Sequence, residues 1–327
     1  MPLFPFPPRT VYYLPFSLPN RLFPFLLPLI LPTSPRLQIR GERMYSDAIR
    51  TLSDQAAAKL AEQRRSLVGH LVRSALAGMY VGAAIVLIFT IGGLLSPSAP
   101  GAVRLVMGVC FGGALTIVIF AGSELFTGSN LVLTLGVLSR RATLRDLADN
   151  WLWTWIGNLA GSILIAWMVV RAGLLDPEPI KGFVLKLVET KMNLPAEQLF
   201  LRAILANWLV CLGVWIAARL KDEMAKILMI WWCMFTFITS GYEHSIANMC
   251  GLMLGLLLPH GDAITWGGYG YNLGLATLGN VVGGAVFVAM LYWIGSPQAR
   301  EQARTMAASR NGDGQDDRVA PEAQRIS

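Results

Sequence analysis

Two acidic residues and a histidine lie in the longest apolar segments of the chain. Glu124 is the single charged residue in 105–139, and Glu243 stands directly before His244 in 227–259, where no other charged residue occurs. A carboxylate can hold backbone N–H groups or a cation, and an imidazole can donate, accept or exchange a proton near neutral pH. Because ionisable groups are costly in such segments, they indicate a functional site.

The composition identifies the surroundings of these groups. The chain is 54% hydrophobic and 14% charged, with a mean hydropathy of +0.51, which indicates an integral membrane protein with the lipid bilayer as its solvent. The net charge of +7 lies in short loops and at the ends of the chain, which argues against nucleic-acid binding. The four cysteines and three histidines show no metal-ligand spacing, so we expect no metal and no cofactor.

Six hydrophobic regions are present. Four of them, 74–95, 151–170, 199–218 and 273–294, suit a single crossing of a hydrocarbon layer about 30 Å thick. The two regions that contain Glu124 and Glu243 would each be about 50 Å long as one straight helix. We therefore predict that both break.

The expected breaks contain glycines. Gly122 and Gly128 flank the acidic residue of the first long region, and Gly241 precedes that of the second. A broken helix leaves backbone N–H and C=O groups unpaired, which is tolerated at membrane depth only inside protein or beside a polar cavity. The breaks therefore predict a path or a binding site, with Gly122, Glu124, Gly128 and Gly241 as its structural support.

The chain also repeats itself. Gly122-Ser123-Glu124 recurs as Gly241-Tyr242-Glu243, and "WIGNLAGS" from Trp155 recurs as "TLGNVVGG" from Thr277. Each half then holds three spans, and an odd number inverts one half relative to the other across the membrane. The predicted fold is all-α, with six transmembrane helices in two inverted three-helix repeats.

The remaining segments have distinct compositions. Residues 1–43 include ten of the 18 prolines, so we expect a disordered segment, or upstream sequence with Met44 as the true start; a functional proline-rich arm is the alternative. Residues 44–70 predict an amphipathic helix with Ile49, Leu52, Ala56 and Leu60 on one face, or else a plain solvated leader helix. The six-helix domain is assigned to 71–296, and 297–327 to a disordered polar tail.

Loop charges predict the orientation. Lys and Arg gather in the leader, in two of the connections between spans and in the tail, whereas the connection between the fifth and sixth spans has none. Both termini should therefore be cytoplasmic, in a multi-pass protein of a bacterial inner membrane. The third connection departs from this pattern, because Lys181, Lys186 and Lys191 lie on the expected outer side.

Several motifs together resemble the formate/nitrite transporter family. They are "GSELFTG", "GNLAGS", "ILANWLVCLGVW", "SGYEHSIANM" and "TLGNVVGGAVF", spread over about 44–293, and "IWWCMFTFITSGYEHSIANM" is most similar to the nitrite branch. The resemblance implies an aquaporin-like protomer, a homopentamer and one pore through each protomer. It also implies small monovalent anions and protons as the transported partners.

The resemblance assigns roles to individual residues. Thr127 and His244 should face each other in the pore, with Glu243 and Asn248 supporting the histidine, and Glu124 should tie down backbone N–H groups in the first repeat. Asn207 matches a family asparagine. Lys191 matches a cation near the outer entrance, although a solvated loop lysine is the alternative interpretation.

An apolar set should narrow the pore on either side of the histidine, where each residue alone would be interpreted as core packing. It comprises Phe111, Leu115, Leu125, Phe126 and Phe237. A dehydrated apolar passage opposes a charged anion and favours a neutral acid. The expected mechanism is therefore that an anion accepts or shares a proton at Thr127 and His244.

The predicted function is a nitrite channel or proton-linked nitrite transporter, and not an enzyme. Formate or hydrosulfide is the alternative within the same family. A water or glycerol channel would need paired Asn-Pro-Ala motifs, which the sequence lacks. From another class, Ser123 and His244 could form an intramembrane serine protease dyad, although no Gly-x-Ser-x-Gly motif is present. A receptor or membrane scaffold would not need two broken helices.

Overall fold

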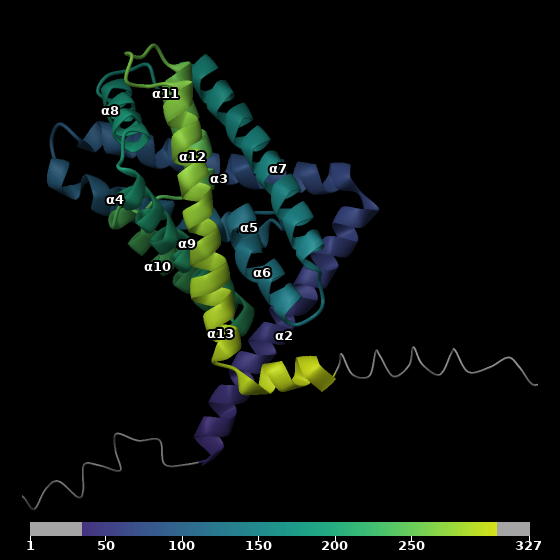
Figure 1. Ribbon diagram of the computed structural model, residues 1–327. Helices are drawn as coiled ribbons and strands as arrows, with labels where there is room; N and C mark the ends of the chain where they lie inside the picture. The colour runs from purple at the N-terminus through teal and green to yellow at the C-terminus, as the bar shows by residue number, and fades with distance from the viewer. Residues whose placement is uncertain (1–34, 306–327) are drawn as a thin grey trace, which may run out of the picture. The chain divides into compact units, whose positions relative to one another are not determined.

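The computed structural model describes residues 35–305, with side chains from residue 45 onward, and every regular element in this part is helical. The chain divides into two units, Met1–Glu42, of which only the start of α2 is described, and Arg43–Ser327. The elements (Figure 1) are α2 (Pro35–Arg65), α3 (Leu67–Leu95), η1 (Pro100–Ala102), α4 (Val103–Phe111), α5 (Gly113–Phe120), α6 (Phe126–Leu138), α7 (Leu144–Arg171), α8 (Ile180–Met192), α9 (Ala196–Arg219), α10 (Glu223–Thr239), α11 (Ser245–Leu257), α12 (Trp266–Val281), η2 (Val282–Met290) and α13 (Leu291–Ile294).

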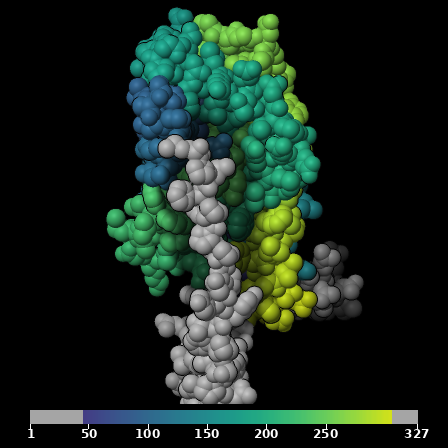
Figure 2. Space-filling view, turned by 90° about the vertical axis from the view of Figure 1, so that its left-hand side faces the viewer, coloured from purple at the N-terminus to yellow at the C-terminus, as the bar shows by residue number. Residues whose placement is uncertain are grey.

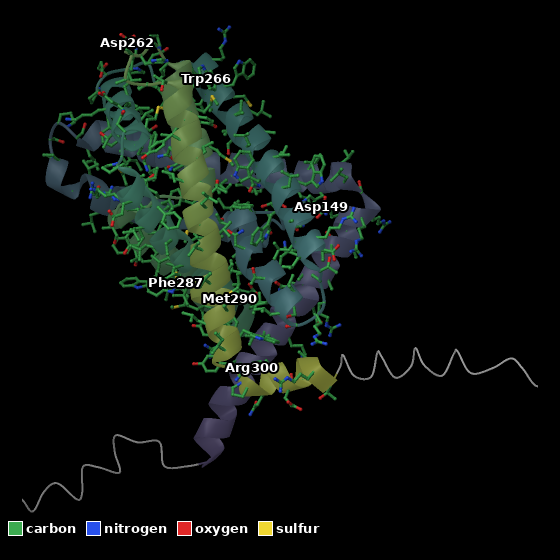
Figure 3. All side chains as sticks on the ribbon, viewed as in Figure 1. Asp149, Asp262, Trp266, Phe287, Met290 and Arg300 are labelled. Atoms are coloured by element: carbon green, nitrogen blue, oxygen red, sulfur yellow. The ribbon has the colours of Figure 1, made fainter. Side chains whose placement is uncertain are left out.

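Within the described part, five helices are long and apolar enough to cross a membrane: Leu67–Leu95, Pro100–Phe120, Leu144–Arg171, Ala196–Arg219 and Trp266–Ile294. The sixth predicted region is divided between α10 and α11. The last span is continuous through a π-helical stretch, η2, and Figure 3 shows Asp262 and Trp266 at one end of it and Met290 toward the other. Both predicted breaks are present, after α5 and after α10.

The two predicted repeats are α3 to α7 and α9 to α13. They meet where their equivalent motifs touch, because Trp155 Nε1 donates to Thr277 Oγ1 at 3.1 Å. Trp155 and Thr277 begin the two motifs that matched in the sequence. A contact between equivalent positions is expected where the axis that relates two repeats passes between them.

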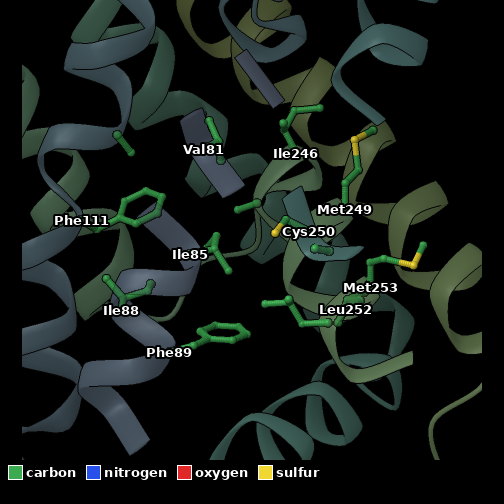
Figure 4. Packing of buried hydrophobic residues seen from close by; sticks show 14 of the residues in the cluster. Val81, Ile85, Ile88, Phe89, Phe111, Ile246, Met249, Cys250, Leu252 and Met253 are labelled. Atoms are coloured by element: carbon green, nitrogen blue, oxygen red, sulfur yellow. The ribbon is translucent and has the colours of Figure 1, made fainter. Parts of the chain in front are cut away.

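The main apolar core joins α3 to α11. Val81, Ile85 and Phe89 of α3 are buried against side chains of α11 that include Ile246 and Cys250 (Figure 4). Because α11 is the helix that follows the second break, this packing fixes the position of that break. Burial of large aliphatic and aromatic side chains contributes about 1.5–3 kcal/mol each.

The apolar face of α2 is buried, which makes the solvated-leader interpretation wrong. Ile49, Leu52, Ala56 and Leu60 belong to a second core cluster with residues of α6 and α9. The helix begins at Pro35 and not at the expected Met44. Proline is tolerated in the first turn because the N–H groups there have no partner within the helix. The rest of the proline-rich segment lies outside the described residues.

The expected disorder after residue 296 is also wrong for 297–305, which are helical. Ala299 and Ala303, one helical turn apart, are buried beside Ile49 and Ser46 of α2. Small apolar side chains at that spacing let the two helices approach closely. Residues 306–327 of the expected tail are outside the described part.

Helix α8 was not predicted, because its three lysines indicated a loop. Val184, Val188 and Met192 recur every fourth residue and are buried, which is the helical signal that the charges obscured. Figure 1 shows α8 at the same end as the loop between α11 and α12, and in Figure 2 the teal and light-green residues of these regions stand together at that end.

The contact between α3 and α7 yields a prediction about stability. A Cβ added at Gly161 would lie 2.6 Å from the carbonyl carbon of Ala75 and 2.9 Å from its Cα, and these are backbone atoms. We expect Gly161→Ala to destabilise the protein by about 1–3 kcal/mol, because neither helix can yield without losing other contacts. Thermal unfolding of the purified protein, followed by tryptophan fluorescence, measures this.

Gly274→Ala is the matched control. A Cβ at Gly274, also within a helix, has no atom within 4 Å. This variant should unfold at or slightly above the wild-type temperature, since alanine is the better helix former. Equal unfolding temperatures for Gly161→Ala and wild type would contradict the close approach of the two backbones.

Candidate functional site

The two helix breaks have the same backbone conformation. Gly122 has φ of +70° and Gly241 has φ of +74°, a region that residues with a Cβ rarely adopt. Each glycine therefore allows the chain to leave one helix and re-enter the next. Gly128, expected at the first break, lies instead in the first turn of α6. A Cβ added there would meet Val214 at 3.7 Å, an ordinary contact distance.

Asn158 closes the first break. Its Oδ1 accepts from Phe126 N at 2.9 Å, and its Nδ2 donates to Ser74 O at 2.7 Å and to Glu124 O at 2.8 Å. One buried amide thus satisfies a donor and an acceptor that the break left unpaired and ties both to α3.

Asn280 does the same at the second break. Its Oδ1 accepts from Ser245 N at 2.8 Å, and its Nδ2 donates to Ala203 O at 2.7 Å and to Glu243 O at 3.1 Å. These asparagines were quoted in the repeat motifs "WIGNLAGS" and "TLGNVVGG" but were not named as site residues. Their equal positions in the two repeats were the signal that pointed to them.

The acidic residues of the two breaks make equivalent hydrogen bonds to the first helix of their own repeats. Glu124 N donates to Arg73 O and Glu243 N donates to Arg202 O, both at 3.2 Å. The carboxylates point to lysines, because Lys59 Nζ lies 2.5 Å from Glu124 Oε2 and Lys191 Nζ lies 2.7 Å from both oxygens of Glu243. The expectation that Glu124 ties down backbone N–H groups is wrong for the described contacts: its carboxylate pairs with Lys59, and only its backbone N–H and C=O take part in the bridges.

Thr127 and His244 meet between the two breaks, as the resemblance implied. The Oγ1 of Thr127 lies 2.9 Å from Nε2 of His244, and both residues are buried. The other ring nitrogen, Nδ1, accepts the backbone N–H of Ala247 at 3.1 Å and caps α11. Because Nδ1 is an acceptor, the proton of the neutral imidazole is on Nε2, which then donates to the threonine hydroxyl.

Apolar side chains, described by two ring contacts and a small cavity, lie beside His244. The rings of Phe111 and Phe237 are 5.7 Å apart between centroids, and Phe237 is 5.8 Å from the His244 ring. With Leu115 and Leu125 they line a cavity of about 10 Å³ beside the histidine. Such a volume is at the lower limit for one water molecule, so the space beside the histidine is nearly dry.

Two other expected residues, Phe126 and Asn207, do not line this cavity. The ring of Phe126 packs edge-on against Trp151, with centroids 6.1 Å apart. Asn207 donates to Asn130 Oδ1 at 2.9 Å and to Asn280 O at 2.6 Å, so it braces an asparagine of the second break. Among the described contacts, neither side chain bonds to the side chains of Thr127 and His244.

A cavity of about 200 Å³ lies on the α8 side of the histidine. Lys191 occupies its wall with Glu243 and Asn248, and Asn248 Nδ2 donates to Glu243 Oε2 and to Asn272 Oδ1, both at 2.8 Å. Lys191 is therefore a fixed member of a polar cluster. Arg104 also lines this cavity and was not identified from the sequence.

A second cavity, of about 540 Å³, lies on the α2 side of the constriction. Lys59 and Glu124 line it together with Leu115 and Leu125, which it shares with the constriction. Lys59 was not named as a site residue. It corresponds to Lys191, because each lysine lies on the helix that precedes a repeat and contacts the acidic residue of that repeat's break.

The serine protease interpretation is not supported by the contacts. Ser123 Oγ donates to Val118 O at 3.1 Å, whereas His244 contacts Thr127 and Ala247. The two halves of the hypothetical dyad therefore have other partners.

Known membrane transporters are similar to this chain over most of its length. The family described as formate/nitrite transporter matches residues 46–294. The chain is 43% identical over 262 residues to the nitrite transporter NirC of Salmonella typhimurium, covering 80% of this chain and 95% of the relative. A probable formate transporter of Methanothermobacter thermautotrophicus is 39% identical over 242 residues, covering 68% and 87%.

Two solved structures have similar folds. A chain described as an FNT family ion channel is 44% identical, with a TM-score of 0.73, and covers 77% of this chain and 99% of itself. A pentameric formate channel with formate bound is 24% identical, with a TM-score of 0.62, covering 71% and 98%. The second likeness concerns the fold alone.

The asparagine bridges predict a large loss of stability for one substitution. Asn280→Leu removes three hydrogen bonds and leaves Ser245 N–H and two carbonyls buried without these partners. At about 1–3 kcal/mol for each unsatisfied group, we expect a loss of several kcal/mol, measured by thermal unfolding. Asn193→Leu, at an exposed asparagine that bonds only to backbone carbonyls, is the control and should cost about 1 kcal/mol or less. Similar losses in both variants would argue against the bridge.

Proposed function

The chain belongs to the formate/nitrite transporter family, and we propose that it moves nitrite across the membrane through the passage between its two cavities. The proposal is carried by one observation, the Thr127–His244 pair held at two helix breaks inside an apolar constriction. The substrate is supported by relatives at 43% identity that are named nitrite transporters.

The α8-side cavity collects the anion. Arg104, Lys191 and Arg202 line it, against one carboxylate, Glu243. An excess of cationic groups in a cleft with apolar walls raises the local concentration of anions, because the field is focused there. Lys191 also has its ammonium fixed by Glu243 and Asn248, so it does not need to be ordered when the anion arrives.

The anion then reaches two hydrogen-bond donors. The Nε2–H of His244 and the hydroxyl of Thr127 both lie at the constriction, and an anion oxygen that inserts between them accepts from each. The dry passage beyond favours a neutral species, so nitrite takes one proton there and crosses as nitrous acid. That proton comes from water in the α8-side cavity and is relayed through the Thr127 hydroxyl and His244 Nε2, each of which gives up one proton and regains one. In the resting state His244 supplies a hydrogen bond and not its own charge, because Nδ1 is already occupied by Ala247 N–H.

Formate and hydrosulfide are the alternative substrates. Formate shares the size and single charge of nitrite, and a relative at 39% identity is named a probable formate transporter. Nothing in the Thr127–His244 geometry distinguishes the two oxygen acids, so flux measurements must rank them.

The setting of the pore is part of the proposal. We place the protein in a bacterial inner membrane with both termini cytoplasmic, supported by the loop charges, and as a homopentamer, supported by the fold it shares with a pentameric channel. The α8-side cavity then faces the outside and the α2-side cavity the cytoplasm.

Lys191 provides a test of anion collection. Lys191→Gln should raise the half-saturation concentration for nitrite about tenfold, because it removes a cation and exposes the charge of Glu243 to the cavity. Nitrite influx into proteoliposomes over a range of concentrations measures this. Lys186→Gln, on an exposed face of the same helix, is the matched control and should leave the value unchanged. If both variants raised the half-saturation concentration equally, the change would be due to the net charge of the protein and not to the position of Lys191.

His244 provides a test of proton linkage. Nitrite, formate, nitrate and chloride fluxes are compared at two pH values, and wild-type nitrite flux should rise as pH falls, because the crossing species carries a proton. His244→Ala should abolish this dependence, whereas His260→Ala, at an exposed loop histidine, should retain it.

The outcomes separate the parts of the proposal. Faster formate than nitrite would change the substrate only. A pH dependence that survives in His244→Ala would remove the histidine from the proton step. Absence of flux for all four anions would contradict the pore itself.

A further inference from the structure

The α8-side cavity is larger and more apolar than a three-atom anion requires. Its volume is about 200 Å³, whereas about 10–15 Å³ on the same measure holds one water molecule. Much of its wall is hydrocarbon, from Ile85, Ile88, Phe89, Phe183, Leu187 and Ile238. Apolar walls on this scale lower the free energy of a ligand that brings its own apolar group.

We propose that this cavity binds monovalent anions that carry a ring or a branched apolar group, and that such anions block the passage. The blocking step rests on the proposed function, because it requires a conducting pore, whereas the binding step does not.

One face of α8 supplies both the apolar contact and the cation of the proposed binding site. Leu187 and Lys191 are four residues apart and line the same cavity, which places them about 6 Å apart along the helix axis. That spacing matches an anionic group attached directly to a six-membered ring. Phe183 continues the apolar face one turn further. Ile88 and Phe89 (Figure 4) add to it from α3, on which α8 packs through Gly92 and Gly93.

The charged side chains that line the cavity favour an anion of low charge. Arg104, Lys191 and Arg202 face Glu243, and Lys191 is already bonded to both oxygens of that carboxylate. Arg202 Nη2 lies 3.4 Å from Gln198 Oε1. Because this amide is neutral, it does not cancel the positive charge of Arg202. The cavity thus has a modest excess of positive charge.

The constriction prevents such a ligand from passing. Beyond the cavity, the rings of Phe111 and Phe237 stand 5.7 Å apart between centroids, and the space beside His244 is about 10 Å³. A ring cannot enter that space without displacing both phenylalanines. It therefore stays in the cavity and occupies the route of smaller anions.

The opposite cavity has different electrostatics. Glu62, Glu124 and Glu223 line it against Lys59 and Lys226 among the described residues, so carboxylates are in excess there. An amphiphilic anion added from that side should bind weakly. The block is therefore one-sided.

Calorimetry with the purified full-length protein tests the binding step. Benzenesulfonate and methanesulfonate carry the same permanently ionised group, so neither carries protons across a membrane and only the ring distinguishes them. We expect benzenesulfonate to bind about tenfold more tightly or better. Leu187→Ala should remove most of this preference, whereas Leu185→Ala, on the same helix but not in the cavity wall, should preserve it.

Flux measurements test the block. Benzenesulfonate added outside proteoliposomes should reduce nitrite influx in competition with nitrite, through the pores whose α8 side faces outward. Equal affinities for the two sulfonates, or unchanged ring preference in Leu187→Ala, would overturn the proposed binding site even if nitrite flux is normal. Ring-selective binding in a protein that moves no nitrite would support the site and contradict the proposed function.

Discussion

The structure depends on a requirement that two broken helices impose. At membrane depth the backbone groups at each break cannot bond to water, so the protein must supply their partners. Asn158 and Asn280 meet this requirement with one amide each, and both connect the break to the first helix of the same repeat. The two breaks are therefore held mainly by these asparagine side chains, and His244 adds one further bond by capping α11.

Charge near the breaks is balanced by helices that lie outside the two repeats. Lys59 of α2 reaches Glu124 and Lys191 of α8 reaches Glu243, so each acidic residue is paired by the helix that precedes its repeat. Removing water from a carboxylate without such a partner would cost several kcal/mol. This pairing also brings a cation to each cavity. The same contacts therefore stabilise the breaks and shape the electrostatics of the passage.

Two different environments lie on either side of the Thr127–His244 pair. The α8-side cavity, lined by Lys191 and Arg104, favours an anion, whereas the space between Phe111 and Phe237 is too small and apolar for a hydrated charge. The Thr127–His244 pair stands between these environments. The Ala247 N–H donates to Nδ1 of His244, so the neutral imidazole donates through Nε2. This arrangement supports transfer of an anion together with a proton.

The sequence by itself determined the helical class, the two broken spans and the inverted repeats, because helix length, Gly122, Gly241 and apolar runs are local properties. It also located Thr127 and His244, through the family motifs around them. Only the tertiary structure decided that Phe126 faces Trp151 and that Lys59 reaches Glu124. Lys59 and Glu124 are 65 positions apart, and Lys191 and Glu243 are 52 apart. Local periodicity contains no information on which distant groups meet, since that depends on how the helices pack.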